Sequence, residues 1–127
     1  MKITGFRPLI VTKDLESTVK VFEALGFERH HHRTGIENGE NELFVMQDAE
    51  GNRVNVVSSE AVPRDFTAIS INVDNFQEAY EFFLSQGFVN PRGEKVTDVP
   101  ASKGTMVVAP SGVVVTINEH IKEASEE

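Results

Sequence analysis

Three consecutive histidines, His30, His31 and His32, form the densest group of potentially reactive side chains in this sequence. Imidazole can ligate a metal ion, transfer a proton near neutral pH or make an ordinary polar contact. In a regular strand His30 and His32 would share one face and could bind one ion, while His31 would share the other face with Arg29 and Arg33. No third ligand is evident, so we expect a polar strand rather than a metal site; a pH-sensitive contact is an alternative.

Other catalytic signatures are missing from the sequence. The chain has no cysteine, which excludes a thiolate nucleophile, a disulfide and a cysteine-based zinc site. It has no glycine-rich phosphate loop and no serine nucleophile motif. Glu119 and His120 are a conceivable acid–base pair, but adjacent strand residues point to opposite faces. The net charge of −8, without a basic cluster, argues against nucleic-acid binding.

Length and hydropathy indicate a single domain away from membranes. The 127 residues are enough to bury a core, and no apolar run approaches the roughly 20 residues needed to cross a bilayer. The first residues lack the apolar region and cleavage site of a signal peptide. We therefore expect a cytoplasmic protein without a membrane partner.

An internal repeat organises the chain. "EALGF" (23–27) recurs as "LSQGF" (84–88), "DAEGNRVNVV" (48–57) aligns with "APSGVVVTIN" (109–118), and "RPLIVTKD" (7–14) aligns with "AISINVDN" (68–75), always at an offset of 61 residues. Three ungapped matches at one spacing indicate a duplicated unit of about sixty residues. We assign residues 1–61 and 62–122 to two modules of one structural domain, and residues 123–127 to a frayed acidic tail.

Each module is expected to contain a strand, a helix and three further strands. Residues 66–73 alternate as a half-buried strand, Asn75 and Glu78 form a capping box, and Gly87 ends the helix. In the first half the corresponding cap, apolar stripe and stop are Asp14, then Leu15, Val19, Phe22 and Leu25, then Gly26. The later strands are predicted at 27–33, 42–47 and 53–58, and at 88–92, 104–109 and 113–119.

Paired β-α-β-β-β modules, with "LGF" after the helix and a turn glycine before the last strand, resemble the vicinal oxygen chelate superfamily. That group includes glyoxalase I, bleomycin-resistance proteins and extradiol dioxygenases, and the resemblance runs from about Ile3 to His120. It implies an α+β fold in which two tandem modules form curved mixed sheets around a cup. Such a fold hosts many chemistries, so the fold alone does not define an activity.

The resemblance also implies where metal ligands would stand. In metal-dependent members they lie on the first and last strands of each module, which correspond here to Arg7, Asn55, Ala68 and Thr116. Arginine is a cation, alanine has no donor atom, and the amide and hydroxyl oxygens are weak neutral ligands. We therefore expect no metal and no other cofactor, which favours a binding protein over an enzyme.

The expected function is that of a glyoxalase/bleomycin-resistance-like protein that binds a small organic molecule in the cup. The alternative is an enzyme, either a metal-dependent lyase or dioxygenase with atypical ligands, such as His30 and His32, or a metal-free isomerase. A third alternative is a structural or regulatory protein whose cup is filled by its own side chains. Small members of the group usually form homodimers, so we also expect a homodimer. The predicted ligand contacts face the cup, with Arg7 suited to a carboxylate or phosphate: Arg7, Leu9, Arg53, Asn55, Ser70, Asn72 and Thr116.

Overall fold

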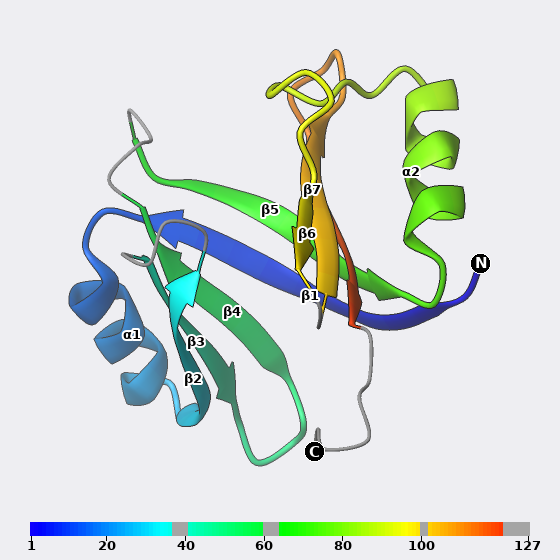
Figure 1. Ribbon diagram of the computed structural model, residues 1–127. Helices are drawn as coiled ribbons and strands as arrows, with labels where there is room; N and C mark the ends of the chain where they lie inside the picture. The colour runs from blue at the N-terminus through cyan, green and yellow to red at the C-terminus, as the bar shows by residue number, and fades with distance from the viewer. Residues whose placement is uncertain (37–40, 60–63, 100–101, 121–127) are drawn as a thin grey trace. The chain divides into compact units, whose positions relative to one another are not determined.

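A computed structural model describes residues 1–36, 41–59, 64–99 and 102–120, although the side chains of 33–36, 41, 97–99 and 102 are not described. The chain contains two β-α-β-β-β modules in tandem (Figure 1). This confirms the predicted α+β fold class. The predicted tail, residues 123–127, lies outside the described residues.

The first module consists of β1 (Ile3–Thr12), α1 (Leu15–Ala24), β2 (Glu28–Ile36), β3 (Asn41–Gln47) and β4 (Arg53–Ser58). Its strand order is β2-β3-β4-β1. The pairs β2·β3 and β3·β4 are antiparallel, whereas β1 runs parallel to β4, with Leu9 opposite Asn55 and Val11 opposite Val57.

The second module repeats this plan with β5 (Phe66–Val73), α2 (Phe76–Ser85), β6 (Thr97–Val99), β7 (Ser102–Val108) and β8 (Val114–His120). Its strand order is β5-β8-β7-β6, and β5 runs parallel to β8, with Ser70 opposite Thr116.

The chain forms two compact units, one of Arg7–Ala68 and one of Met1–Phe6 with Ile69–Glu127. We refer to them as the first and second unit. The start of β1 belongs to the second unit because Lys2 exchanges two hydrogen bonds with Asp74: its amide donates to Oδ1 at 2.6 Å, and its carbonyl accepts from the Asp74 amide at 3.0 Å. The terminal ammonium of Met1 also pairs with Glu78 at 2.6 Å.

Both helices have the predicted N-cap residues and are followed by the predicted glycines. The Asp14 side chain accepts from the Ser17 amide at 3.1 Å, and Asn75 accepts from the Glu78 amide at 3.0 Å, so each satisfies a free donor of the first turn. Gly26 and Gly87 follow the helices with φ of +107° and +95°, a conformation that other residues adopt only with strain. The capping box is incomplete, because the Glu78 side chain, which would accept from the Asn75 amide, pairs with the Met1 ammonium. Glu119 Oε1 accepts from the Phe76 amide at 2.7 Å and satisfies another donor of the first turn.

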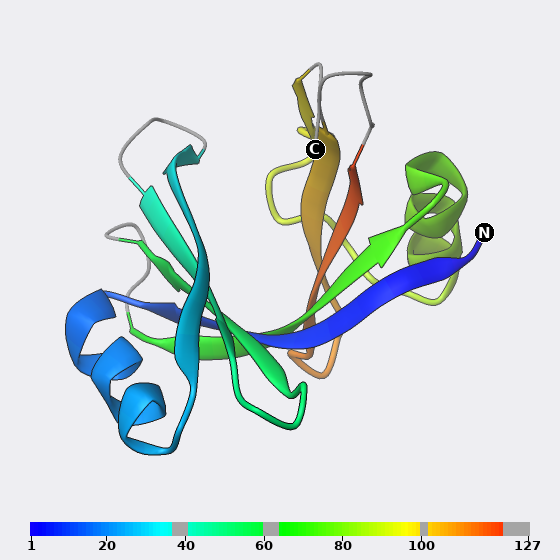
Figure 2. The same cartoon turned by 90° about the horizontal axis from the view of Figure 1, so that it is seen from below.

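One helix packs on one face of each module's sheet (Figures 1 and 2). In the first unit α1 buries Leu15 and Val19 against four strand residues, Phe44, Met46, Val54 and Val56. In the second unit α2 buries Phe76 and Ala79 against Ile71, Val73, Val107, Val115 and Ile117. The other face of each sheet therefore carries no helix of its own module, and we call it the helix-free face.

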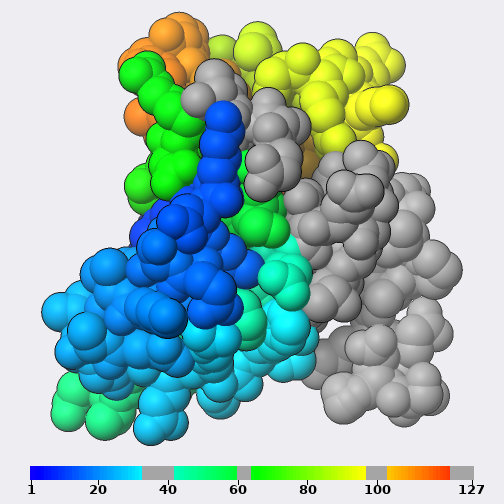
Figure 3. All heavy atoms as spheres, turned by 90° about the vertical axis from the view of Figure 1, so that its left-hand side faces the viewer, coloured from blue at the N-terminus to red at the C-terminus, as the bar shows by residue number. Residues whose placement is uncertain are grey.

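Two local predictions are wrong. Leu25 is 67% exposed rather than part of the buried stripe of α1, because the helix ends at Ala24 and Leu25 is its C-cap. Figure 3 shows α1, in blue, uncovered on its outer side. The stripe stops at Phe22, which is only partly buried.

The expected strand at 88–92 is also not formed. Only Val89 makes an isolated bridge, to Val108, and β6 instead forms at Thr97–Val99. Pro91 lacks an amide donor, and the Asn90 side chain accepts from the Arg92 amide at 2.9 Å, which turns the chain before a strand can extend.

Candidate functional site on the helix-free face of the first unit

The helix-free face of the first unit is defined by strand alternation. Ile10, Phe44 and Val56 contribute to the core beneath α1. The residues that alternate with them along β1, β3 and β4 therefore point to the other side of the sheet. From β1 and β4 this face carries Arg7, Leu9 and Val11, then Arg53, Asn55 and Val57. From β3 it carries Leu43, Val45 and Gln47, because Val45 pairs with Asn55 and Gln47 with Arg53.

Arg7 is the most unusual residue on this face. It is half-buried, and none of the described residues makes a hydrogen bond or ion pair with its guanidinium. Burial, and then the nearby positive charge of Arg53, lower the pKa of Arg7 below its ordinary value. A salt bridge to an acid, which would explain an arginine structurally, is therefore not seen within the part of the chain that the structure describes.

Arg53 lies beside Arg7 and is held from one side. Arg7 and Arg53 each stand two residues before the directly paired Leu9 and Asn55, which places them next to each other on parallel strands. The Nε of Arg53 donates to Gln47 Oε1 at 2.8 Å. This bond uses the inner edge of the guanidinium and leaves its two terminal nitrogens without a partner among the described residues.

Asn55 supplies a second unsatisfied group. Its Oδ1 is buried and has no hydrogen-bond partner in the described structure. An unpaired buried acceptor costs about 1–3 kcal/mol, so such atoms are rare where nothing uses them. Apolar side chains surround it in the sheet: Leu9 lies opposite on β1 and Val45, 8% exposed, lies opposite on β3.

On the equivalent face of the second unit, three polar side chains form a hydrogen-bonded cluster. The Asn118 amide nitrogen lies 3.4 Å from Ser70 Oγ, 3.3 Å from the Ile71 carbonyl and 3.5 Å from Thr116 Oγ1. Gly104 makes room for this side chain, since a Cβ there would lie 2.8 Å from Asn118 Oδ1. The hydroxyl oxygens of Ser70 and Thr116 thus accept hydrogen bonds within the protein, from Asn118.

The remaining predicted site residues are Asn72 and the metal-ligand position Ala68. Asn72 is half-buried on β5, and Ala68 is 3% exposed. For all the predicted contacts, the role in ligand binding stays a prediction.

The residues at the four expected metal-ligand positions do not fit a divalent ion. Arg7 presents a cation, Ala68 presents no donor, and the Thr116 hydroxyl already takes part in the Asn118 cluster. Within the described residues, no group of three or more histidines, aspartates or glutamates is arranged to hold a metal.

The histidine strand departs from regular alternation. A bulge separates Arg29, opposite Met46, from His31, opposite Val45. Arg29 and His32 consequently share one face, where both contact the Phe44 ring: His32 stacks at 4.2 Å and the Arg29 guanidinium lies 4.7 Å from the ring centre. Grouping Arg29 with His31 was therefore wrong, because a bulge adds one residue and reverses the facing.

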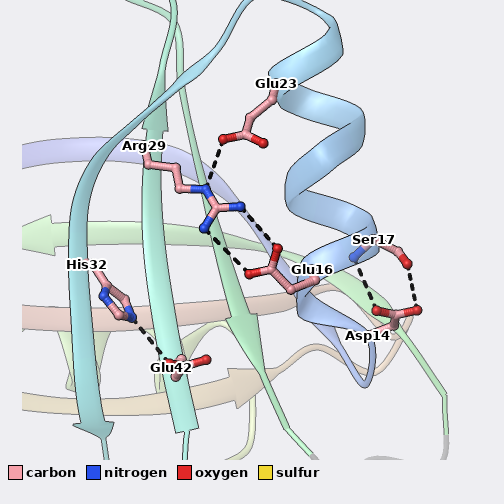
Figure 4. A network of polar contacts seen from close by, with 7 residues as sticks. All are labelled: Asp14, Glu16, Ser17, Glu23, Arg29, His32 and Glu42. Atoms are coloured by element: carbon pink, nitrogen blue, oxygen red, sulfur yellow. Dashed lines mark hydrogen bonds and ion pairs between the residues drawn. The ribbon is translucent and has the colours of Figure 1, made fainter.

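This arrangement gives the strand's charged groups structural partners (Figure 4). Arg29 bridges Glu16 and Glu23 of α1 at 3.1 and 2.9 Å, and His32 Nε2 lies 3.4 Å from Glu42 Oε2. The alternation that would have aimed His30 and His32 at one ion is interrupted at the bulge. The side chain of Arg33 lies outside the described part of the chain.

A surface hollow of about 380 Å³ lies at the bulge, and neither Arg7 nor Asn55 lines it. Its lining includes Glu28, His30, Gln47 and Asp48. The Asp48 carboxylate is already occupied by the turn before β4, where it accepts from the amides of Asn52 at 2.8 Å and Glu50 at 3.0 Å. We therefore place the candidate site on the helix-free face, where polar groups lack partners, and not in this hollow.

Sequence reasoning missed Gln47, which fixes Arg53. Gln47 lies two residues after Val45, so strand alternation alone places both side chains on the helix-free face. Only the β3·β4 register shows that Gln47 is paired with Arg53.

Comparison with known proteins gives structural relatives only. Neither a protein-family model nor a curated protein sequence matches the chain. Among solved structures, glyoxalase I from Zea mays superposes with a TM-score of 0.70 at 15% identity over 95% of this chain and 44% of that one. Methylmalonyl-CoA epimerase from Mycobacterium tuberculosis gives a TM-score of 0.69 at 15% identity over 94% of this chain and 90% of that one.

A glyoxalase/bleomycin resistance protein/dioxygenase superfamily member from Vibrio splendidus gives a TM-score of 0.60 at 15% identity, over 91% of this chain and 97% of that one. The chain spans less than half the length of the maize enzyme. These similarities confirm the resemblance at the level of the fold: the chain has the vicinal oxygen chelate fold. In the described part of the chain, neither helix is long and apolar enough to cross a membrane.

Proposed function

We propose that this protein binds a small organic molecule on the helix-free face of the first unit, without the metal that the fold often carries. The observation that supports this most strongly is the set of polar groups on that face, Arg7 and Asn55, which the described protein leaves without partners. Placed among Leu9, Val11 and Val45, they form the mixture of apolar surface and few polar groups that is typical of ligand sites.

Binding is favoured over catalysis by the chemistry of this face. Arginine and asparagine orient a ligand but are poor proton acceptors or nucleophiles at neutral pH. Of the acid–base pair considered in the sequence, Glu119 is used structurally, because its Oε1 accepts a hydrogen bond from the amide of Phe76 at the start of α2. The named activities of the maize and mycobacterial relatives are therefore not transferred to this chain.

Two measurements test this proposal. A thermal-shift screen of metabolites and antibiotics should find small molecules that raise the melting temperature, as any ligand specific to the native state must. Metal analysis of the purified protein should find no stoichiometric divalent ion. One bound metal per chain, lost when His30 and His32 are both replaced, would instead support the metal-dependent lyase or dioxygenase.

A further inference from the structure

We infer that the ligand is an acid, and that Arg7 and Arg53 together bind its carboxylate or phosphate group. This inference rests on the proposed function and adds the chemical class of the ligand. It follows from two guanidinium groups that stand side by side on β1 and β4 while the described residues supply neither with a carboxylate.

The two guanidinium groups stand in an unfavourable arrangement in the free protein. Arg53 contributes to the lowered pKa of Arg7, so the two charges repel each other in the free protein. Like charges held together without compensation destabilise a fold, and a half-buried one is screened less than an exposed one. An oxyanion between them would replace this repulsion with two charge-assisted interactions, which are stronger than hydrogen bonds between neutral groups.

The guanidinium of Arg53 is oriented for binding an oxyanion. The Nε of Arg53 donates a hydrogen bond to Gln47 Oε1 at 2.8 Å, which restricts the orientation of the guanidinium and leaves its two terminal nitrogens available to a ligand. A guanidinium binds carboxylate or phosphate oxygens through two parallel N–H groups. Gln47 is thus a positioning residue for Arg53.

The two modules differ in charge on this face. At the repeat offset of 61 residues, Arg7 corresponds to Ala68 and Arg53 to Val114. The second module therefore has no cation at these positions, and its polar residues Ser70, Thr116 and Asn118 satisfy one another. Recognition of the charged end of the ligand belongs to the first unit alone.

The net charge of −8 does not oppose this inference. Charges more than about 8 Å away are largely screened at physiological ionic strength, whereas groups in contact with the ligand are not. The acidic surface will slow the approach of an anion more than it weakens the bound state.

The inference is tested by calorimetric titration with matched probes. Lactate, mandelate and 3-phenyllactate are compared with their primary amides, and glycerol 3-phosphate with glycerol, each up to about 10 mM. We expect at least one acid to bind and its neutral counterpart to bind about tenfold more weakly or not at all. The carboxylate and phosphate probes decide between the two kinds of acid.

Variants then assign the binding to the two arginines. Arg7→Gln and Arg53→Gln should each lower the affinity for the acid by about tenfold. Lys20→Gln, which removes the same charge from the exposed side of α1, should leave this affinity unchanged. Gln47→Leu should lower the affinity for the acid less than Arg53→Gln does, because it removes the hydrogen bond that orients Arg53 but keeps the guanidinium.

Three results would overturn the inference. If neutral amides bind as tightly as the acids, the ligand class is wrong while the proposed binding function stands. If acids bind and both arginine variants bind them unchanged, the assigned residues are wrong. If no probe binds and the metabolite screen is also negative, both the inference and the proposed function fail.

Discussion

At the scale of single residues, the first unit keeps a costly arrangement that its own fold does not explain. Arg7 is half-buried, unpaired among the described residues and repelled by Arg53. Asn55 Oδ1 is buried without a donor. Functional sites are where proteins tolerate such local conflicts, because the compensating partner arrives from outside.

Because this arrangement is costly, we predict that the protein becomes more stable when Arg7 is replaced. Replacing Arg7 by glutamine removes the repulsion by Arg53 and the cost of burying a charge. The free energy of unfolding should rise by about 0.5 kcal/mol, in line with stabilising changes at functional positions. Chemical denaturation of Arg7→Gln beside the charge-matched Lys20→Gln measures this. A loss of more than about 1 kcal/mol would mean that Arg7 is a structural residue.

At the scale of elements, local signals in the sequence were sufficient where contacts are local. The caps at Asp14 and Asn75 follow from side chains that accept hydrogen bonds from amides three residues ahead, and the glycines after both helices from the positive φ of the backbone there. The strand at 66–73 was found from its alternation. These features need no knowledge of the rest of the chain.

Elements that depend on distant partners could not be predicted. The bulge before His31 is defined by its register with β3, and His32 reaches the Phe44 ring only through that register. The position of β6 depends on its pairing with β7, not on its own three residues. The orphaned Asn55 oxygen likewise becomes visible only when its neighbours in space are known.

One turn yields a prediction about acid stability. Hydrogen bonds, first from the Asn52 side chain and then from backbone amides, lower the pKa of Asp48. A lowered folded pKa stabilises the protein above the unfolded value of about 3.9, and this contribution is lost as the pH falls through the folded pKa. Asp48→Asn should therefore lower the melting temperature at pH 7, and the difference from wild type should shrink below about pH 4.

Glu50→Gln, which removes an equal charge two residues away, is the control for this experiment. Its melting temperature should stay close to that of the wild type throughout the titration. A difference between Asp48→Asn and wild type that is constant down to about pH 2 would show that the turn does not depend on the charge of Asp48.

At the scale of the whole molecule, the modules end in the strands β2 and β6, one in each strand order. Terminal strands carry backbone groups that invite pairing, and symmetric association of two chains is a common way to cover them. We therefore predict a homodimer. Light scattering at micromolar concentration should give a mass near twice the 14.1 kDa of one chain. A monomer that still binds an acid would contradict this prediction.

The most direct test of the proposed binding site is to locate a bound acid by amide chemical shifts. The acidic probe that binds most tightly is titrated into isotopically labelled wild-type protein and into the Arg7→Gln variant. We predict saturating shifts concentrated on β1 and β4, at Arg7 to Val11 and Arg53 to Val57, which are lost in the variant. Shifts concentrated instead at the hollow beside His30 and Asp48, and unchanged in Arg7→Gln, would contradict the account.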